Sequence, residues 1–403
     1  MLLSLMLWGC PKPPEPPKDV CSADLSWVTN PTQPNEVPET ESFCDFYQFS
    51  WQWFLAQTSL SESNPKERVF ETQRVYDPDG GDNQCSMELE GKEDFLDQME
   101  PRTIKSDKFE HVEADGGALY DKNGNILYYG VYYSKELCSA TEKGFVPGTL
   151  EIKTSWMILK EDSDKHYKIT LDDGKVLGMV GMHMAIWTPN HPEMLWVTWE
   201  HKDNAPLCNG SSPKQNWNFV SPEAEKCLKE NKATEPYGIP EECLKYNFNT
   251  PSKQEGSIPI TGQPNNVCQE YEYGNQYGNS VNGNDNNENL KSIVELNQQI
   301  VGVNGFLTKL PKENPMHIWS NYQMVGGIWT KDGVDSGKLP VDSKQGPADP
   351  NSPQRGSLEL TNTTMETFQQ GSESYIPNCF GCHNYTKDSP LTVSHIQQKL
   401  KAE

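Results

Sequence analysis

Two strand-like runs joined by a turn, Val176–Thr188 (VLGMVGMHMAIWT) and Met194–His201 (MLWVTWEH), decide the fold predicted for this chain. The runs are rich in the aromatic, β-branched and other apolar residues that favour strands. Between them lies PNHPE, residues 189–193, a strong turn signal. We therefore expect a hairpin of an antiparallel sheet.

Further strand-like runs extend this sheet in both directions: Ile126–Tyr133, Leu150–Leu159 and Tyr322–Trp329. A helix is expected to begin near Ser42, where Ser42 and Asp45 have capping-box spacing ahead of an aromatic stripe. A second helix is expected around Leu290–Ile300, and Thr363 with Glu366 predicts a third, short one. These elements predict an α+β protein with a β-rich main domain and peripheral helices.

The composition changes along the chain and predicts its domain organisation. We expect a signal-like segment at 1–10, a proline-rich tether at 11–40, a β-rich body at 41–345 and a C-terminal segment at 346–403. Residues 205–290, rich in Cys, Asn and Pro, look like an irregular insertion within the body.

The cysteines indicate an oxidising compartment. Eight of the 11 lie at positions 21–268, outside the two ends of the chain. An even number of this kind predicts up to four disulfides, although eight cysteines allow 105 pairings. Because Cys227 and Cys243 enclose only a short loop, they are the pair that the sequence favours.

The N-terminal run Met1–Gly9 ends at Cys10 in LWGC, which resembles a bacterial lipobox with its lipid-accepting cysteine. The run Pro11–Lys18 that follows is expected to form an extended polyproline tether. The resemblance implies membrane attachment through a lipid on Cys10, and Pro11 at the next position implies the outer membrane. The alternative is an apolar terminus whose cysteine forms an ordinary disulfide.

Near the other end, residues 379–383 read CFGCH, the C-x-x-C-H pattern that attaches a c-type haem. Thiols three positions apart lie about one helical turn from each other, so Cys379 and Cys382 can both bond one porphyrin while His383 binds its iron. The other chemical interpretations are a thioredoxin-like dithiol, which needs a βαβ context, and half of a zinc site, which needs a second ligand pair. The motif therefore predicts one covalent haem c.

The sixth iron ligand stays open. His395 lies twelve residues beyond His383, Met365 lies before the motif, and His183 lies within a predicted strand. A vacant position is the fourth possibility, and it would permit peroxide or small-ligand chemistry, whereas two strong ligands favour electron transfer. Only 20 residues follow His383, so the body must help to cover the haem.

The formal charge of -23 and the isoelectric point of about 4.8 disfavour nucleic-acid binding, which requires clustered Lys and Arg. An acidic surface attracts cationic partners, and a basic redox protein is one of them. The run 200–203 (EHKD) could bind a metal, but such a run at a strand end is more often a local hydrogen-bond cluster.

Three blocks resemble a group of bacterial cytochrome c family proteins with one C-terminal haem motif: SWQWF (50–54), TWEHKDNAP (198–206) and LTNTTMETF (360–368). The resemblance implies a haem protein of the cell envelope, with haem roles for Cys379, Cys382 and His383. We expect an exported single-electron carrier rather than an enzyme. The alternatives are a haem-dependent oxidoreductase with its substrate site in the β-rich body, and a lipoprotein whose haem senses redox state or a gas.

Overall fold

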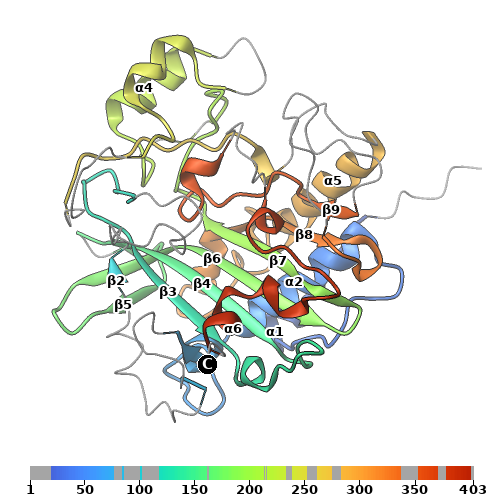
Figure 1. Cartoon of the computed structure of the whole chain (residues 1–403). Coiled ribbons are helices and arrows are strands. Elements are labelled where there is room, and N and C mark those ends of the chain that lie inside the picture. Colours follow the sequence, from blue (N-terminus) through green and yellow to red (C-terminus); the bar gives the residue numbers. More distant parts are fainter. Residues whose placement is uncertain are drawn as a thin grey trace, which may run out of the picture.

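The computed structural model describes residues 20–76, 84–85, 100–101, 118–160, 163–212, 214, 216–232, 238–251, 261–274, 283–336, 353–370 and 378–400. The strands in these ranges are β1 (Arg74–Val75), β2 (Glu100–Pro101), β3 (Tyr128–Tyr133), β4 (Leu150–Ile158), β5 (Lys168–Thr170), β6 (Val176–Thr188), β7 (His191–His201), β8 (Tyr322–Thr330) and β9 (Gln354–Gly356). They form one antiparallel sheet along the path β1-β3-β4-β6-β7-β8-β9, with β2 paired to β3 and β5 to β6 (Figure 1). The predicted α+β class is confirmed.

The helices of the described ranges are peripheral to this sheet. The α-helices are α1 (Ser26–Thr29), α2 (Phe43–Thr58), α4 (Pro222–Glu230), α5 (Gly283–Val301) and α6 (His395–Leu400). The 3-10 helices are η1 (Val69–Thr72), η2 (Lys135–Ser139), η3 (Glu241–Tyr246), η4 (Glu272–Gly274), η5 (His317–Asn321), η6 (Lys331–Gly333), η7 (Thr367–Gln369), η8 (Cys379–Gly381) and η9 (Pro390–Val393).

The expected hairpin is β6 and β7, and its turn is shorter than the sequence predicts. Thr188 already pairs with His191, so Pro189 and Asn190 alone make the turn. The His191 N–H donates to the Thr188 hydroxyl at 3.2 Å, and its fully buried ring bonds Glu193 at 2.9 Å. These buried contacts extend the strand back from Met194 to His191, through residues that the sequence assigns to the turn.

Helices α2 and α5 cover one face of the sheet (Figure 1). The predicted capping box starts α2: the Ser42 hydroxyl accepts from Asp45 N at 3.2 Å, and the Asp45 carboxylate accepts from Ser42 N at 2.9 Å. The aromatic stripe of α2 packs on inward-facing residues of β6, β7 and β8, in one large core. Within it Phe54 stacks on Trp199 with ring centroids 4.7 Å apart.

Residues 353–370 and 378–400 of the C-terminal segment cover the opposite face of the sheet, in front of the strands in Figure 1. Residues of the two layers form a second cluster that includes Ala185, Trp196, Ile328, Phe380 and Val393. Gly181 on β6 permits the close approach, since a Cβ there would lie 2.6 Å from the Thr364 hydroxyl. The site described below sits between these two layers.

The predicted insertion at 205–290 has a small core of its own. It contains α4 and η3, with a cluster that includes Cys208, Trp217, Leu228, Cys243 and Phe248. Two disulfides fix it, Cys208–Cys268 and the pair that the sequence favours, Cys227–Cys243. With Cys21–Cys44 and Cys85–Cys138 the described disulfides number four, as the cysteine count predicts. The last residues of this range begin α5, a helix that packs in the main core and not in the small one.

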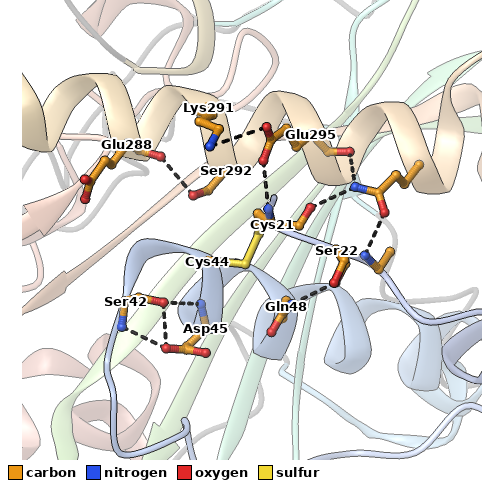
Figure 2. The surroundings of a disulfide bond; sticks show 12 residues. Cys21, Ser22, Ser42, Cys44, Asp45, Gln48, Glu288, Lys291, Ser292 and Glu295 are labelled. Carbon is orange, nitrogen blue, oxygen red and sulfur yellow. Dashed lines mark hydrogen bonds and ion pairs between the residues drawn. A yellow bond between two sulfur atoms is a disulfide. The ribbon is translucent and has the colours of Figure 1, made fainter. Parts of the chain in front are cut away.

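The predicted tether, residues 11–40, is described only from Val20 on, and this part packs against the body. The Cys21–Cys44 disulfide joins it to α2, and the Cys21 N–H donates to Glu295 of α5 at 2.8 Å (Figure 2). The Gln48 side chain of α2 donates to the Ser22 carbonyl at 2.7 Å. Cys21 and Ser22 are therefore held between α2 and α5.

The variant Cys21→Ser/Cys44→Ser is expected to lose about 3 kcal/mol of unfolding free energy, because the bond closes a loop of 23 residues in the unfolded chain. Urea titration measures this loss. Amide exchange should at the same time become faster in residues 20–40, while the β6–β7 hairpin keeps its protection. Unchanged stability would contradict a structural role for this bond.

Candidate functional site

The sequence motif of residues 379–383 forms a single tight turn. Asn378 caps it: its side-chain oxygen accepts from Phe380 N at 3.0 Å, and its amide donates to the Leu358 carbonyl at 2.8 Å. Cys379 O accepts from Cys382 N at 3.1 Å and from His383 N at 2.8 Å. Phe380 is buried in the cluster between segment and sheet. The turn therefore brings the two thiols and the imidazole close together and anchors them to the body.

Cys379 and Cys382 are the two described cysteines that form no disulfide. Burial raises the pKa of Cys379, and the nearby Glu366 carboxylate raises it further. The pKa of Cys382 is raised by the same two causes. Both side chains are thus thiols at neutral pH, which argues against a reactive dithiol of the thioredoxin kind, whose nucleophile has a lowered pKa.

The imidazole of His383 is fixed by its surroundings. Its Nδ1 bonds the Val393 carbonyl at 2.9 Å, and because a carbonyl only accepts, Nδ1 carries the proton. The ring lies against Trp196 on β7 and against His395, with both centroid distances 4.2 Å. Burial lowers the pKa of His383 to about 3, so the ring is neutral at pH 7. A neutral ring with Nδ1 engaged leaves Nε2 as its metal-binding atom.

His395 lies beside His383 rather than opposite to it. It is the first residue of α6, its ring stacks on His383 at 23°, and its Nε2 bonds the Cys382 carbonyl at 3.2 Å. The ring of His395 is thus engaged with the imidazole that would bind the iron. His395 would have to leave this stack to serve as the predicted sixth ligand.

The other two predicted sixth ligands are engaged elsewhere. Met365 is fully buried in a separate cluster with Tyr129, Val180 and Phe219. His183 lies on the sheet face under the C-terminal segment, where its Nε2 is 3.0 Å from both carboxylate oxygens of Glu366. Burial acts to raise the pKa of Glu366, but the charge and hydrogen bond of His183, together with the Lys153 charge and the Asn362 N–H, outweigh burial and hold this pKa at about 2.

The short helix predicted from Thr363 and Glu366 is wrong. Glu200 on β7 accepts from Thr363 N at 2.8 Å and also bonds the Thr363 hydroxyl, while Glu366 is turned toward His183. Both side chains that would cap a helix are thus used to dock the segment on the sheet. In place of the predicted α-helix, the structure has only the short 3-10 helix η7, Thr367–Gln369.

The run 200–203 does not gather into a metal site. Glu200 points to the C-terminal segment, whereas the His201 ring stacks on His166 with centroids 4.0 Å apart. Asp203 pairs with Lys165 and Lys214, each at 3.0 Å. No group of three or more His, Cys, Asp or Glu side chains suited to a metal ion occurs among the described residues.

Several residues of the site carry no sequence signal. Val393 contributes only a backbone carbonyl, and Asn378 and Trp196 act through contacts that depend on the docked segment. Glu151, Lys153 and Ser155 are polar at alternate positions of β4, and Lys153 is paired in register with His183 on β6. This alternation could have marked these residues as part of the sheet face that meets the segment.

Cys10 and the signal-like segment 1–10 lie outside the described residues. In the ranges that are described, no helix is both long and apolar enough to cross a bilayer. Comparisons of the chain with protein-family models, with curated proteins and with solved structures found no match.

Glu359, a buried carboxyl of the C-terminal segment, allows a test of the charge balance there. Burial and the charge of Glu270 raise the pKa of Glu359 from 4.5, its value in the unfolded chain, to about 7. Ionisation of Glu359 therefore destabilises the fold progressively as the pH rises from 4.5 through 7. Glu359→Gln is therefore expected to gain about 3 kcal/mol of unfolding free energy at pH 8 and almost none at pH 4. Urea titration at the two pH values checks this, and an equal change at both would contradict it.

Proposed function

We propose that this chain is an exported c-type cytochrome with one haem, bound covalently by Cys379 and Cys382, that transfers single electrons in the cell envelope. The observation that carries the proposal is the C-x-x-C-H turn, with both thiols outside disulfides and with the His383 Nδ1 proton held by the Val393 carbonyl. A backbone carbonyl is one of the usual partners of the second ring nitrogen in metal-binding histidines, together with carboxylates and water.

A bound haem would supply a one-electron couple at its iron. The residues of the chain would attach the haem, orient it and shield it from water. Cys379 and Cys382 would hold the porphyrin by thioether bonds, and His383 would present Nε2 to the iron. The Val393 carbonyl would keep that imidazole in one tautomer and orientation. Trp196 and Phe380 would exclude water from the side where the segment meets the sheet.

The envelope location rests on the cysteines and on the N-terminus. Four described disulfides are typical of a protein that folds in an oxidising compartment. We propose that Cys10 carries a lipid and that the protein faces the periplasm from a membrane, with the outer membrane favoured by Pro11. The net charge of -23 supports a basic redox protein as its partner.

The second candidate is a haem-dependent oxidoreductase that acts on peroxide or on another small ligand. It is favoured by the positions of the three predicted sixth ligands: His395 lies beside His383, Met365 is buried in another cluster, and His183 is bonded to Glu366. An iron with no strong sixth ligand would be open to such chemistry.

Optical spectra distinguish these two functions. The chain would be produced with the machinery that attaches haem c, and spectra recorded oxidised, reduced and after addition of carbon monoxide. A low-spin reduced spectrum that carbon monoxide leaves unchanged supports electron transfer. A high-spin iron that binds carbon monoxide supports the oxidoreductase instead. A protein without the pyridine haemochrome signal of haem c would refute both.

A further inference from the structure

A buried pair of titratable side chains lies at the turn between β6 and β7, outside the site described above. His191 and Glu193 are both fully buried, and His191 Nδ1 lies 2.9 Å from Glu193 Oε1. The same carboxyl oxygen accepts from Thr330 N at 2.9 Å, as expected of a carboxylate. A carboxylate buried this deeply is costly unless a positive charge pairs with it. The geometry therefore favours a protonated imidazole.

A second carboxylate faces the other nitrogen of this imidazole. His191 Nε2 has no hydrogen-bond partner among the described residues, and the carboxylate oxygen Oε1 of Glu41 lies 3.8 Å from it. Negative charges near both ring nitrogens favour the charged form of the ring. Burial acts to lower the pKa of His191, but the hydrogen bond and charge of Glu193 outweigh burial, together with the charges of Glu41 and Glu36, and raise this pKa.

Glu36 and Glu41 belong to one segment, residues 36–41, which leads into α2. Oε2 of Glu36 accepts from Asn190 N in the turn at 3.1 Å, and its Oε1 accepts from Val37 N at 2.9 Å. Glu41 has a φ of 45°, in the left-handed region that is unfavourable for residues other than glycine. Contacts elsewhere have to offset this cost. Two carboxylates thus dock the segment on the turn, one by bonding its backbone and the other by facing the imidazole.

The neighbouring elements bring no other positive charge into this buried pair. Phe46 of α2 meets the imidazole edge-on at 4.9 Å, and Asp45 beside it is bonded within the capping box. Lys331 and Asp332 of η6, which packs beside β7, are both exposed. Burial raises the pKa of Tyr385, which lies near the buried carboxylate, so its phenol is neutral. The imidazolium is therefore the charge that offsets the carboxylates.

We propose that His191 is a pH-sensitive latch, which as an imidazolium holds residues 36–41 on the β6–β7 turn and releases them when it loses its proton. The Cys21–Cys44 disulfide closes the stretch of chain that contains the segment, so release is confined to that loop. Because the pKa of His191 is raised above the 6.5 of the unfolded chain, the latch is complete below pH 6.5. Its contribution is lost as the pH rises through the raised value.

The variant Glu41→Gln weakens the latch without disturbing the buried pair. Glu41 is partly exposed, so the chain should fold, and the substitution removes only the charge that faces His191 Nε2. Glu39→Gln is the matched control, because it removes the same charge from the same segment at an exposed position. A difference between the two variants therefore reports the position of the charge and not the net charge of the protein.

Nitrogen-15 NMR of the full chain with labelled histidines follows the protonation of His191 directly. We expect a titration midpoint above 6.5 in the native chain and in Glu39→Gln, and a lower midpoint in Glu41→Gln. A native midpoint at or below 6.5, or an unchanged midpoint in Glu41→Gln, would overturn the proposal.

Amide hydrogen exchange measures the docking of the segment, through the N–H groups of Asn190 and Val37 that donate to it. Their protection factors should fall on the order of tenfold as the pH passes through the midpoint of the imidazole, because the segment opens locally. The fall should begin at a lower pH in Glu41→Gln. Cys243 N, bonded within the insertion, should keep its protection factor. Protection that is independent of the imidazole would refute the latch and leave the proposed function of the haem motif unaffected.

Discussion

The variant Cys379→Ser/Cys382→Ser is expected to carry no covalently attached haem when it is produced with the haem-attachment machinery. Serine hydroxyls do not form the thioether bonds that hold the porphyrin, and both thiols of the turn are removed. The turn itself should persist, since its bonds run between backbone atoms of residues 379–383 and from Asn378. Denaturing electrophoresis with haem staining measures the attached haem.

The matched control is Cys227→Ser/Cys243→Ser, which also removes two sulfur atoms, but from a disulfide in the insertion. It should retain a full complement of covalent haem while losing about 3 kcal/mol of stability. Covalent haem in the Cys379→Ser/Cys382→Ser variant would contradict attachment at this motif.

Trp199→Ala is expected to cost about 3 to 5 kcal/mol of unfolding free energy. Trp199 is fully buried on β7, where it stacks on Phe54 and meets Trp51 edge-on at 6.0 Å. Its removal leaves a cavity between the sheet and α2 in a core that both layers share. Urea unfolding followed by far-ultraviolet circular dichroism measures the loss.

Trp187→Ala serves as the control, because Trp187 on β6 is only partly buried. Trp187→Ala should cost clearly less unfolding free energy, because removal of a partly exposed side chain leaves no closed cavity. Equal losses for the two variants would mean that the α2 face of the sheet is not the main source of stability.

Local patterns predict the sheet and α2 because they are short-range signals. The apolar run of β6 gives its bounds without error, and the Ser42 and Asp45 pair sets the start of α2. The start of β7 cannot be found in this way. His191 reads as part of a turn, and only its burial against Phe46 and its bond to Glu193 make it a strand residue.

Docking of the C-terminal segment depends on long-range contacts that no local pattern contains. Thr363 and Glu366 have the spacing of a helix cap. In the folded chain, however, Thr363 is bonded to Glu200 and Glu366 to His183, both on the sheet. The motif names Cys379, Cys382 and His383, but the partner of the His383 ring is a main-chain oxygen. A carbonyl is available at every position, so its identity becomes known only when the chain is folded.

The most direct test of covalent haem attachment is the mass of the intact native chain produced with the haem-attachment machinery, followed by mapping of its peptides. We predict a gain equal to one haem, carried by the peptide that contains Cys379 and Cys382. An unmodified mass, or a haem on any other peptide, would contradict it.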